Sequence, residues 1–177
     1  MTDDEIRKLL AESKTIAIVG LSSKPHRSSY EIAHYMQRHG YRIIPVNPRE
    51  TEVLGEKAYP NLAAVPVPVD IVDVFRNSAE IPALTKEVLA LDPKPRAYWL
   101  QVGVSDPPSE ALTEAAGIPT ISNACLMVLH KLMGPAGNRE FNLATSLHVA
   151  GEWPQARLRR LLPQDRSRAR GPLHRCR

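Results

Sequence analysis

The residues best suited to chemistry lie between a short apolar run and a helix-like segment near the N-terminus. The apolar run over residues 16–19 stops at Gly20, and a small polar loop leads to an amphipathic stretch that opens near Ser28. Glycine permits a tight turn and lets a ligand approach the backbone closely. A strand, such a loop and a helix start together present backbone N–H groups to a phosphate. The segment therefore predicts a site for a nucleotide-like ligand.

The loop itself offers polar groups that suit phosphate oxygens. Hydroxyl groups and positive charges come from Ser22, Ser23, Lys24 and Arg27. The Arg27 guanidinium can bind an anion in bidentate fashion. Ser28 or Ser29 is expected to cap the helix, which leaves N–H groups of its first turn free for an anion. An ordinary strand–helix turn with surface charges is the alternative interpretation of the same residues.

Two common nucleotide signatures are absent from the sequence. A G-x-G-x-x-G fingerprint needs a second glycine where Ser22 stands, and no Walker G-x-x-x-x-G-K-[ST] motif occurs. An NAD site also uses Asp or Glu at the end of the second strand. That place holds Asn47, Pro48 and Arg49. A cation there suits a ribose that carries a phosphate, and coenzyme A (CoA) carries a 3′-phosphate.

Apolar runs of strand length alternate with helix-like segments along the first three quarters of the chain. Strands are expected over residues 16–19, 41–46, 69–75, 97–102 and 118–121, and helices over 1–12, 30–39, 78–91, 107–116 and 125–133. A weaker strand is expected near 58–59, and one helical turn over 62–65. This alternation implies right-handed crossovers and predicts an α/β fold, a Rossmann-like open parallel sheet with helices on both faces.

In such a sheet the ligand site lies beyond the carboxyl ends of the strands. The residues expected there are mostly small, amide-bearing or cationic, and they comprise the segments 20–23, 47–49, 75–77 and 101–103. They include no Ser-His-Asp set. Asp70 and Asp73 fall on opposite faces of their strand, so they cannot act as a carboxylate pair. The pattern indicates a binding crevice rather than a reaction centre.

Positive charge is concentrated at the C-terminus. Residues 157–177 hold eight arginines and one acid, whereas residues 1–156 hold 15 basic and 18 acidic residues. We expect a domain over residues 1–136 and a flexible, Arg-rich extension over residues 137–177. Because the domain is mildly acidic, we expect no nucleic-acid partner beyond weak attraction by the extension.

Other chemical classes find little support. No apolar run is long enough to cross a membrane, and the charged N-terminal segment is not a secretory signal. Cys125 and Cys176 lie far apart, which favours a reducing cytoplasm over a disulfide framework. A packing role is favoured for Cys125, and a surface or packing role for His130. His34 and His39 have no Cys or carboxylate at ligand spacing, so we expect no metal site.

Five segments within residues 6–132 carry a family resemblance. They read T-I-A-I-V-G-L-S-S-K-P-x-R-S-S, Y-R-I-I-P-V-N-P, L-G-E-K-A-Y-P-N-L, V-D-I-V-D-V-F-R and Y-W-L-Q-V-G-V. In this order the segments resemble the small single-domain CoA-binding proteins, a family related to the CoA-binding domain of the succinyl-CoA synthetase α subunit. The sequence departs from the family at residues 122–125, Ser-Asn-Ala-Cys, where many members carry a basic residue, and again after Met133.

The resemblance implies a protein that holds CoA or an acyl-CoA without established turnover. By position, the pyrophosphate would meet Gly20, Leu21, Ser22, Lys24, Arg27 and Ser28. The adenosine and its 3′-phosphate would lie near Asn47, Pro48 and Arg49, and the adenine or ribose would be walled by Val74, Phe75 and Arg76. The pantetheine path would be bordered by Gln101 and Gly103.

Two other functions remain as alternatives. One is an NAD(P)-linked Rossmann oxidoreductase, for which no Tyr-Lys or His-acid set can be assembled. The other is a CoA-sensing regulatory module that engages a partner through the basic extension. The sequence also leaves open whether the chain forms a homo-oligomer.

Overall fold

A computed structural model describes residues 1–134 of the 177-residue chain. The predicted boundary at residue 136 and the predicted flexible extension over 137–177 lie outside these residues. Five parallel strands form one sheet in the order β2-β1-β5-β6-β7. Their bounds are β1 Thr15–Val19, β2 Arg42–Val46, β5 Ile71–Val74, β6 Ala97–Leu100 and β7 Thr120–Ile121. The predicted fold class, a Rossmann-like open parallel sheet, is confirmed.

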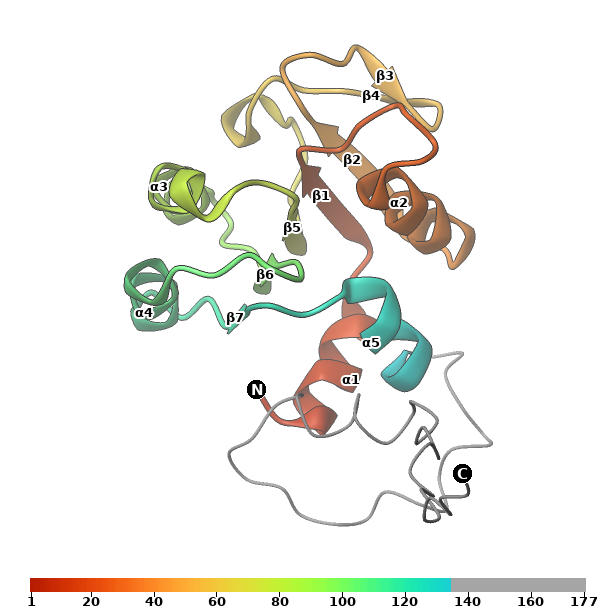
Figure 1. Cartoon of the computed structure of the whole chain (residues 1–177). Coiled ribbons are helices and arrows are strands. Elements are labelled where there is room, and N and C mark those ends of the chain that lie inside the picture. The colour runs from red at the N-terminus through yellow and green to blue at the C-terminus, as the bar shows by residue number, and fades with distance from the viewer. Residues whose placement is uncertain (135–177) are drawn as a thin grey trace, which may run out of the picture. The chain divides into compact units, whose positions relative to one another are not determined.

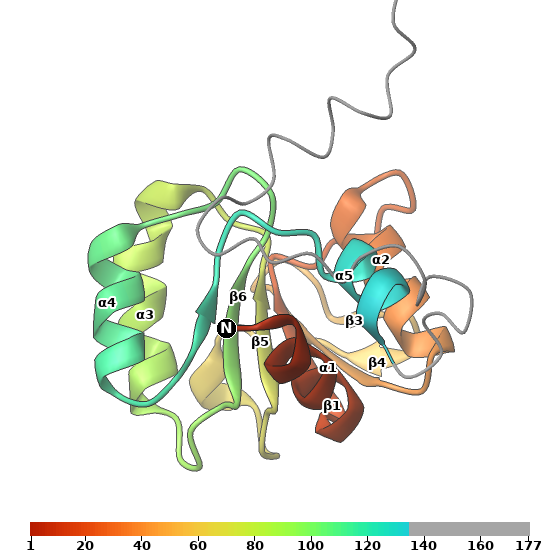
Figure 2. The same ribbon diagram turned by 90° about the horizontal axis from the view of Figure 1, so that it is seen from below.

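Helices cover both faces of this sheet (Figure 1). They are α1 Asp3–Glu12, α2 Ser28–Arg38, α3 Ile81–Ala90, α4 Pro107–Ala115 and α5 Leu126–Met133. Figure 2 shows α3 and α4 on one side of the sheet and α1, α2 and α5 on the other. A short hairpin of β3 (Glu52–Val53) and β4 (Glu56–Lys57) and the 3₁₀ turns η1 (Leu62–Ala64) and η2 (Ser78–Glu80) complete the connections.

The core divides into two layers because strand side chains alternate between the faces. Ile16, Ile18 and Trp99 point toward α1, α2 and α5, whereas Val72 and Val74 pack with α3. Trp99 and Tyr98 are fully buried. All four residues of β5 are buried, because the strand is central and covered on both faces.

The strand order reverses direction at β1. The chain steps from β1 outward to β2 and then crosses back over β1 to β5. In open α/β sheets this switch point opens a crevice at the carboxyl ends of the two strands concerned. Here those ends are Gly20, after β1, and Phe75, after β5, so the topology brings the polar loop after β1 to the place where ligands bind.

Several predicted element boundaries are wrong in informative ways. The helix expected over residues 78–91 divides into η2 and α3, since Pro82 lacks an N–H group and is accommodated only in a first helical turn. The weak strand expected at 58–59 is a single bridge between Tyr59 and Val46, and the preceding residues form the β3–β4 hairpin. The predicted helical turn over 62–65 corresponds to η1.

Candidate functional site

Gly20 fixes the start of the polar loop at the switch point. Its φ is +87°, and its N–H donates to the Val46 carbonyl over 2.8 Å. A Cβ atom at this position would lie only 2.4 Å from the carbonyl oxygen of Phe75. The backbones after β1 and β5 therefore touch at a point that only glycine can occupy.

Internal hydrogen bonds shape the loop between Gly20 and α2. Ser22 N–H donates to the Ser29 hydroxyl (3.2 Å), and Lys24 N–H donates to the Ser22 hydroxyl (3.2 Å). Asn47 donates its side-chain N–H to the Leu21 carbonyl (2.8 Å). Ser22 and Asn47, both predicted as ligand contacts, thus hold the loop against the end of β2.

The predicted helix cap is wrong. Arg27 is the N-cap of α2, and it makes no side-chain capping hydrogen bond. Ser29 lies within the helix, and its hydroxyl accepts from Ser22 N–H. Among residues 1–134, no acceptor meets the backbone N–H groups of Ser28 and Ser29, the first two residues of the helix. These free donors give the helix start the property that suits an anion.

Three cations lie in the loops that follow β1 and β2. The side chains of Lys24, Arg27 and Arg49 are exposed, and none of them forms an ion pair within the described part of the chain. Lys24 and Arg27 come from the loop after β1, and Arg49 comes from the loop after β2. The combination of unpaired cations and free N–H groups is suited to a ligand with more than one phosphate.

Glu50 is a residue that the sequence interpretation missed. The sequence interpretation considered Asn47, Pro48 and Arg49 at the end of the second strand and left out the acid that follows them. A turn in which Glu50 N–H donates to the Asn47 carbonyl brings the acid back toward the loop, where its carboxylate accepts from Ser23 N–H over 2.9 Å. The sequence shows an acid directly after Arg49, but it does not show the turn that brings this acid back toward the loop.

The remaining predicted residues divide by their exposure. Pro48 and Gly103 are exposed, and Gly103 N–H donates to the Asn123 side-chain oxygen (2.8 Å). Phe75 and Arg76 are half-buried, with the Arg76 guanidinium beside Gly20 and 3.5 Å from Glu80. The side chains of Leu21 and Val74 are fully buried in the core. A ligand in the crevice could therefore meet only the backbone of those two residues.

Asp73 is the second residue that was missed. It lies in β5 between Val72 and Val74 and is completely buried, with Gln101 as its hydrogen-bond partner: Gln101 Nε2 donates to Oδ1 over 2.8 Å. Burial raises the pKa of Asp73 to about 7, against the smaller opposing effect of the Gln101 bond. An acid within an apolar strand was the available signal, but Asp73 was weighed only as a partner for Asp70.

Cys125 and His130 occupy packing positions. Cys125 is the N-cap of α5 and is half-buried against the core. His130 is buried, with Nδ1 3.1 Å from the Tyr35 hydroxyl and its ring edge-on to Tyr41, and burial lowers its pKa. Within residues 1–134, no group of three or more His, Cys, Asp and Glu side chains comes together as metal ligands would.

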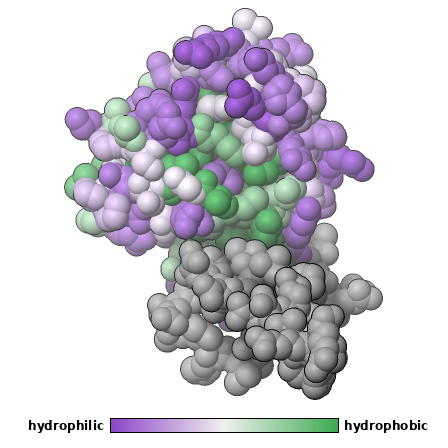
Figure 3. Space-filling model, viewed as in Figure 1, coloured by the Kyte–Doolittle hydropathy of each residue, from purple (hydrophilic) through white to green (hydrophobic). Residues whose placement is uncertain are grey.

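The surface at the strand ends is open rather than enclosed. Figure 3 shows apolar residues in the middle of the face seen in Figure 1, with hydrophilic residues around them toward α2 and the β3–β4 hairpin.

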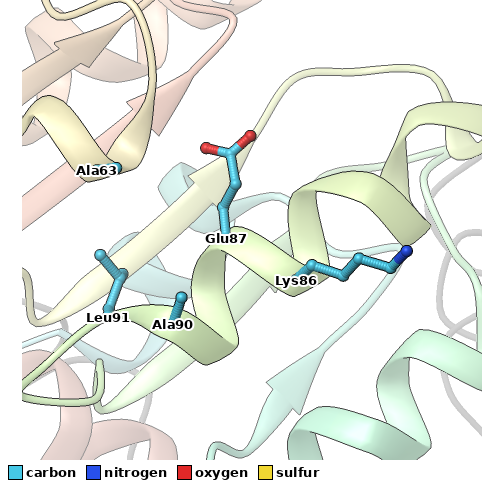
Figure 4. A pocket seen from close by; sticks show the side chains of 5 residues that line it. All are labelled: Ala63, Lys86, Glu87, Ala90 and Leu91. Atoms are coloured by element: carbon cyan, nitrogen blue, oxygen red, sulfur yellow. The ribbon is translucent and has the colours of Figure 1, made fainter.

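A separate hollow of about 300 Å³ lies between η1 and α3 and is lined by Ala63, Lys86, Glu87, Ala90 and Leu91 (Figure 4). There Glu87 accepts from Leu62 N–H, so it ties η1 to α3. No predicted site residue lines this hollow.

Comparison with known proteins identifies the family. Residues 14–131 match the model of the CoA binding domain, and the chain belongs to this family. It is 40% identical over 126 residues to the uncharacterized protein YneT of Bacillus subtilis, a match that covers 71% of this chain and 92% of that protein. A shorter match, 39% over 57 residues, links it to the α subunit of the ADP-forming acetate–CoA ligase II of Pyrococcus furiosus and covers 12% of that subunit.

Solved structures agree with this assignment. The structure of cell-free ID.343 from Thermus thermophilus is 41% identical, with a TM-score of 0.72, and the match covers 75% of this chain and 99% of that one. The predicted membership of the CoA-binding proteins, a family related to the CoA-binding domain of the succinyl-CoA synthetase α subunit, is confirmed. Within residues 1–134, the helices are too short or too polar to cross a membrane.

Proposed function

We propose that this protein binds CoA, free or acylated, in the crevice at the carboxyl ends of β1, β2, β5 and β6, without catalysing a reaction on it. The observation that carries the proposal is the combination of free N–H groups at the start of α2 with Lys24, Arg27 and Arg49 in the loops after β1 and β2, which form no ion pair within the described residues. Membership of the CoA-binding domain family supports CoA as that anion. We expect the protein to act in the cytoplasm, as its two widely spaced cysteines suggest.

The proposal assigns each part of CoA to a part of the crevice. The pyrophosphate lies on the loop after β1, against the N–H groups of Ser28 and Ser29 and between Lys24 and Arg27. Arg49 binds the 3′-phosphate, and Asn47 and Pro48 border the adenosine. The half-buried Phe75 and Arg76 wall the adenine or ribose, and the pantetheine arm passes Gln101 and Gly103.

Calorimetric titration with CoA, 3′-dephospho-CoA and NAD tests the proposal. We expect CoA to bind most tightly, since only CoA carries the phosphate assigned to Arg49. NAD binding as tight as that of CoA would overturn it and would favour a Rossmann oxidoreductase, in which Glu50 would serve as the acid after the second strand.

Arg27→Ala and Arg49→Ala should each weaken CoA binding by about 1–3 kcal/mol, because each removes a charge-assisted hydrogen bond to phosphate. Arg42→Ala is the matched control, since Arg42 is also exposed but begins β2 at the opposite end of the sheet. Arg49→Ala should leave the affinity for 3′-dephospho-CoA almost unchanged. Unaltered CoA affinity in both site variants would refute the phosphate assignments.

Removal of the extension tests whether it contributes to the CoA site. A chain that ends at residue 141 should keep its affinity for CoA, because every residue assigned to the ligand precedes residue 104. Loss of binding on truncation would mean that the extension belongs to the site.

A further inference from the structure

Asp73 and Gln101 form a polar pair within an apolar layer. Asp73 lies in the central strand, and its register neighbours, Ile18 in β1 and Trp99 in β6, are uncharged. Its Oδ1 atom accepts from Gln101 Nε2 over 2.8 Å. Its Oδ2 atom has no partner and is, within residues 1–134, the only buried side-chain oxygen or nitrogen in that condition.

Such a carboxyl is unfavourable for the stability of the sheet. A buried polar group with an unmet hydrogen bond costs free energy, and apolar residues of similar volume are often as stable or more so. The hydrogen bond that Asp73 makes with another side chain goes to the residue that follows β6. The effect of Asp73 on its surroundings is therefore concentrated in the orientation of one amide group.

Gln101 lies where the orientation of its amide group decides which atom faces the strand ends. It is 5% exposed and follows β6 directly, beside the end of β5. Its Nε2 is directed inward to Asp73. Its Oε1 accepts no hydrogen bond from the described part of the chain and is not among the buried unpartnered atoms there, so it reaches the surface at the strand ends.

We infer that Asp73 is a positioning residue that holds the Gln101 amide with its oxygen toward the crevice, where it accepts a hydrogen bond from an amide N–H of the pantetheine arm. This inference rests on the proposed function. Without Asp73 the amide can rotate and present N–H groups, which cannot pair with an N–H donor. Gln101 contacts the ligand, and Asp73 acts only through Gln101.

Calorimetry with two ligands separates this role from a purely structural one. CoA contains the pantetheine arm, whereas adenosine 3′,5′-bisphosphate shares its nucleotide end and lacks the arm. Gln101→Met removes the acceptor at similar volume and should weaken CoA binding about tenfold. Asp73→Leu should weaken it less, about three- to fivefold, because a rotating amide still presents its oxygen part of the time. Binding of the bisphosphate should not change in either variant.

Two further variants complete the test. Asp73→Asn retains an oxygen for Gln101 Nε2 and should bind CoA within about twofold of the wild type. The double variant Asp73→Leu/Gln101→Met leaves no unpaired polar group and should bind CoA no more weakly than Gln101→Met alone, since the two residues act as a unit. Thr85→Val, which alters a buried hydroxyl in α3 on the other face of the sheet, is the matched control and should change neither affinity.

The outcomes distinguish this inference from the proposed function. Equal losses for both ligands, additive losses in the double variant, or unchanged CoA binding in Gln101→Met would overturn the inference. A wild-type protein that binds neither ligand would overturn the proposed function itself. If Asp73→Leu does not fold, the ligand-selective loss in Gln101→Met and the retained affinity of Asp73→Asn still decide the matter.

Discussion

Gly20→Ala should lower the free energy of unfolding by roughly 2–4 kcal/mol and abolish CoA binding. Two effects add. A side chain at φ +87° is strained, and the new Cβ would lie 2.4 Å from the Phe75 carbonyl oxygen, which belongs to the backbone of the central strand and cannot move away cheaply. Relief of that clash requires the loop to leave the end of β5. Urea denaturation measures the first effect and calorimetry the second.

Gly40→Ala provides the matched control for this prediction. Gly40 has nearly the same φ, +91°, but no atom lies within 4 Å of the position its Cβ would take. We expect a loss of about 1 kcal/mol from backbone strain alone, with CoA binding intact. Equal losses of stability in the two variants would show that the close approach to Phe75 contributes nothing.

Asp73→Asn should change how the stability of the protein depends on pH. The pKa of Asp73 is raised to about 7 in the folded protein and returns to its ordinary value, near 3.8, on unfolding. Between these values the folded state keeps a proton that the unfolded state has lost, so wild-type stability falls as pH rises through this range and levels off above it. The asparagine side chain of the variant does not titrate, so the variant should lack this slope.

The expected size of the effect follows from the linkage. Between pH 5 and pH 8 the stability of Asp73→Asn relative to wild type should rise by about 2–3 kcal/mol. Urea unfolding at several pH values measures this difference. The buried His130, whose lowered pKa makes the protein less stable in acid, is present in both proteins and cancels from the comparison. Parallel pH profiles would show that Asp73 is ionised at neutral pH in the folded protein.

The periodicity of the sequence was sufficient to predict the layers and the parallel sheet, because apolar strands and amphipathic helices alternate along most of residues 1–134. The loop after β1 was also located correctly from Gly20. Local spacing could not reveal which N–H groups of other segments donate to these hydroxyl and carboxylate oxygens. Ser29 accepts from Ser22 instead of capping α2, and Glu50 turns back to Ser23.

The role of Asp73 could be recognised only from the register of the strands in the folded sheet, and not from the spacing of residues in the sequence. The sequence placed Asp70 and Asp73 on opposite faces, which is correct for a strand, and that removed them as a carboxylate pair. Only the alignment of β5 with β6 shows that Asp73 and Gln101, 28 positions apart, meet at the same face. Side-chain alternation also explains why Val74, although near the strand end, is buried on the face that packs against α3.

The contact between Glu50 and Ser23 gives the loop an internal substitute for a ligand. The Glu50 carboxylate accepts a hydrogen bond from a backbone N–H group of the kind that donates to phosphate oxygens in such loops. A bound phosphate that uses this donor must displace a competitor tethered to the chain at high effective concentration. We expect this competition between the carboxylate and the phosphate to limit the affinity for CoA and to speed the release of CoA. A protein built in this way would follow the surrounding concentration of CoA rather than retain the cofactor permanently.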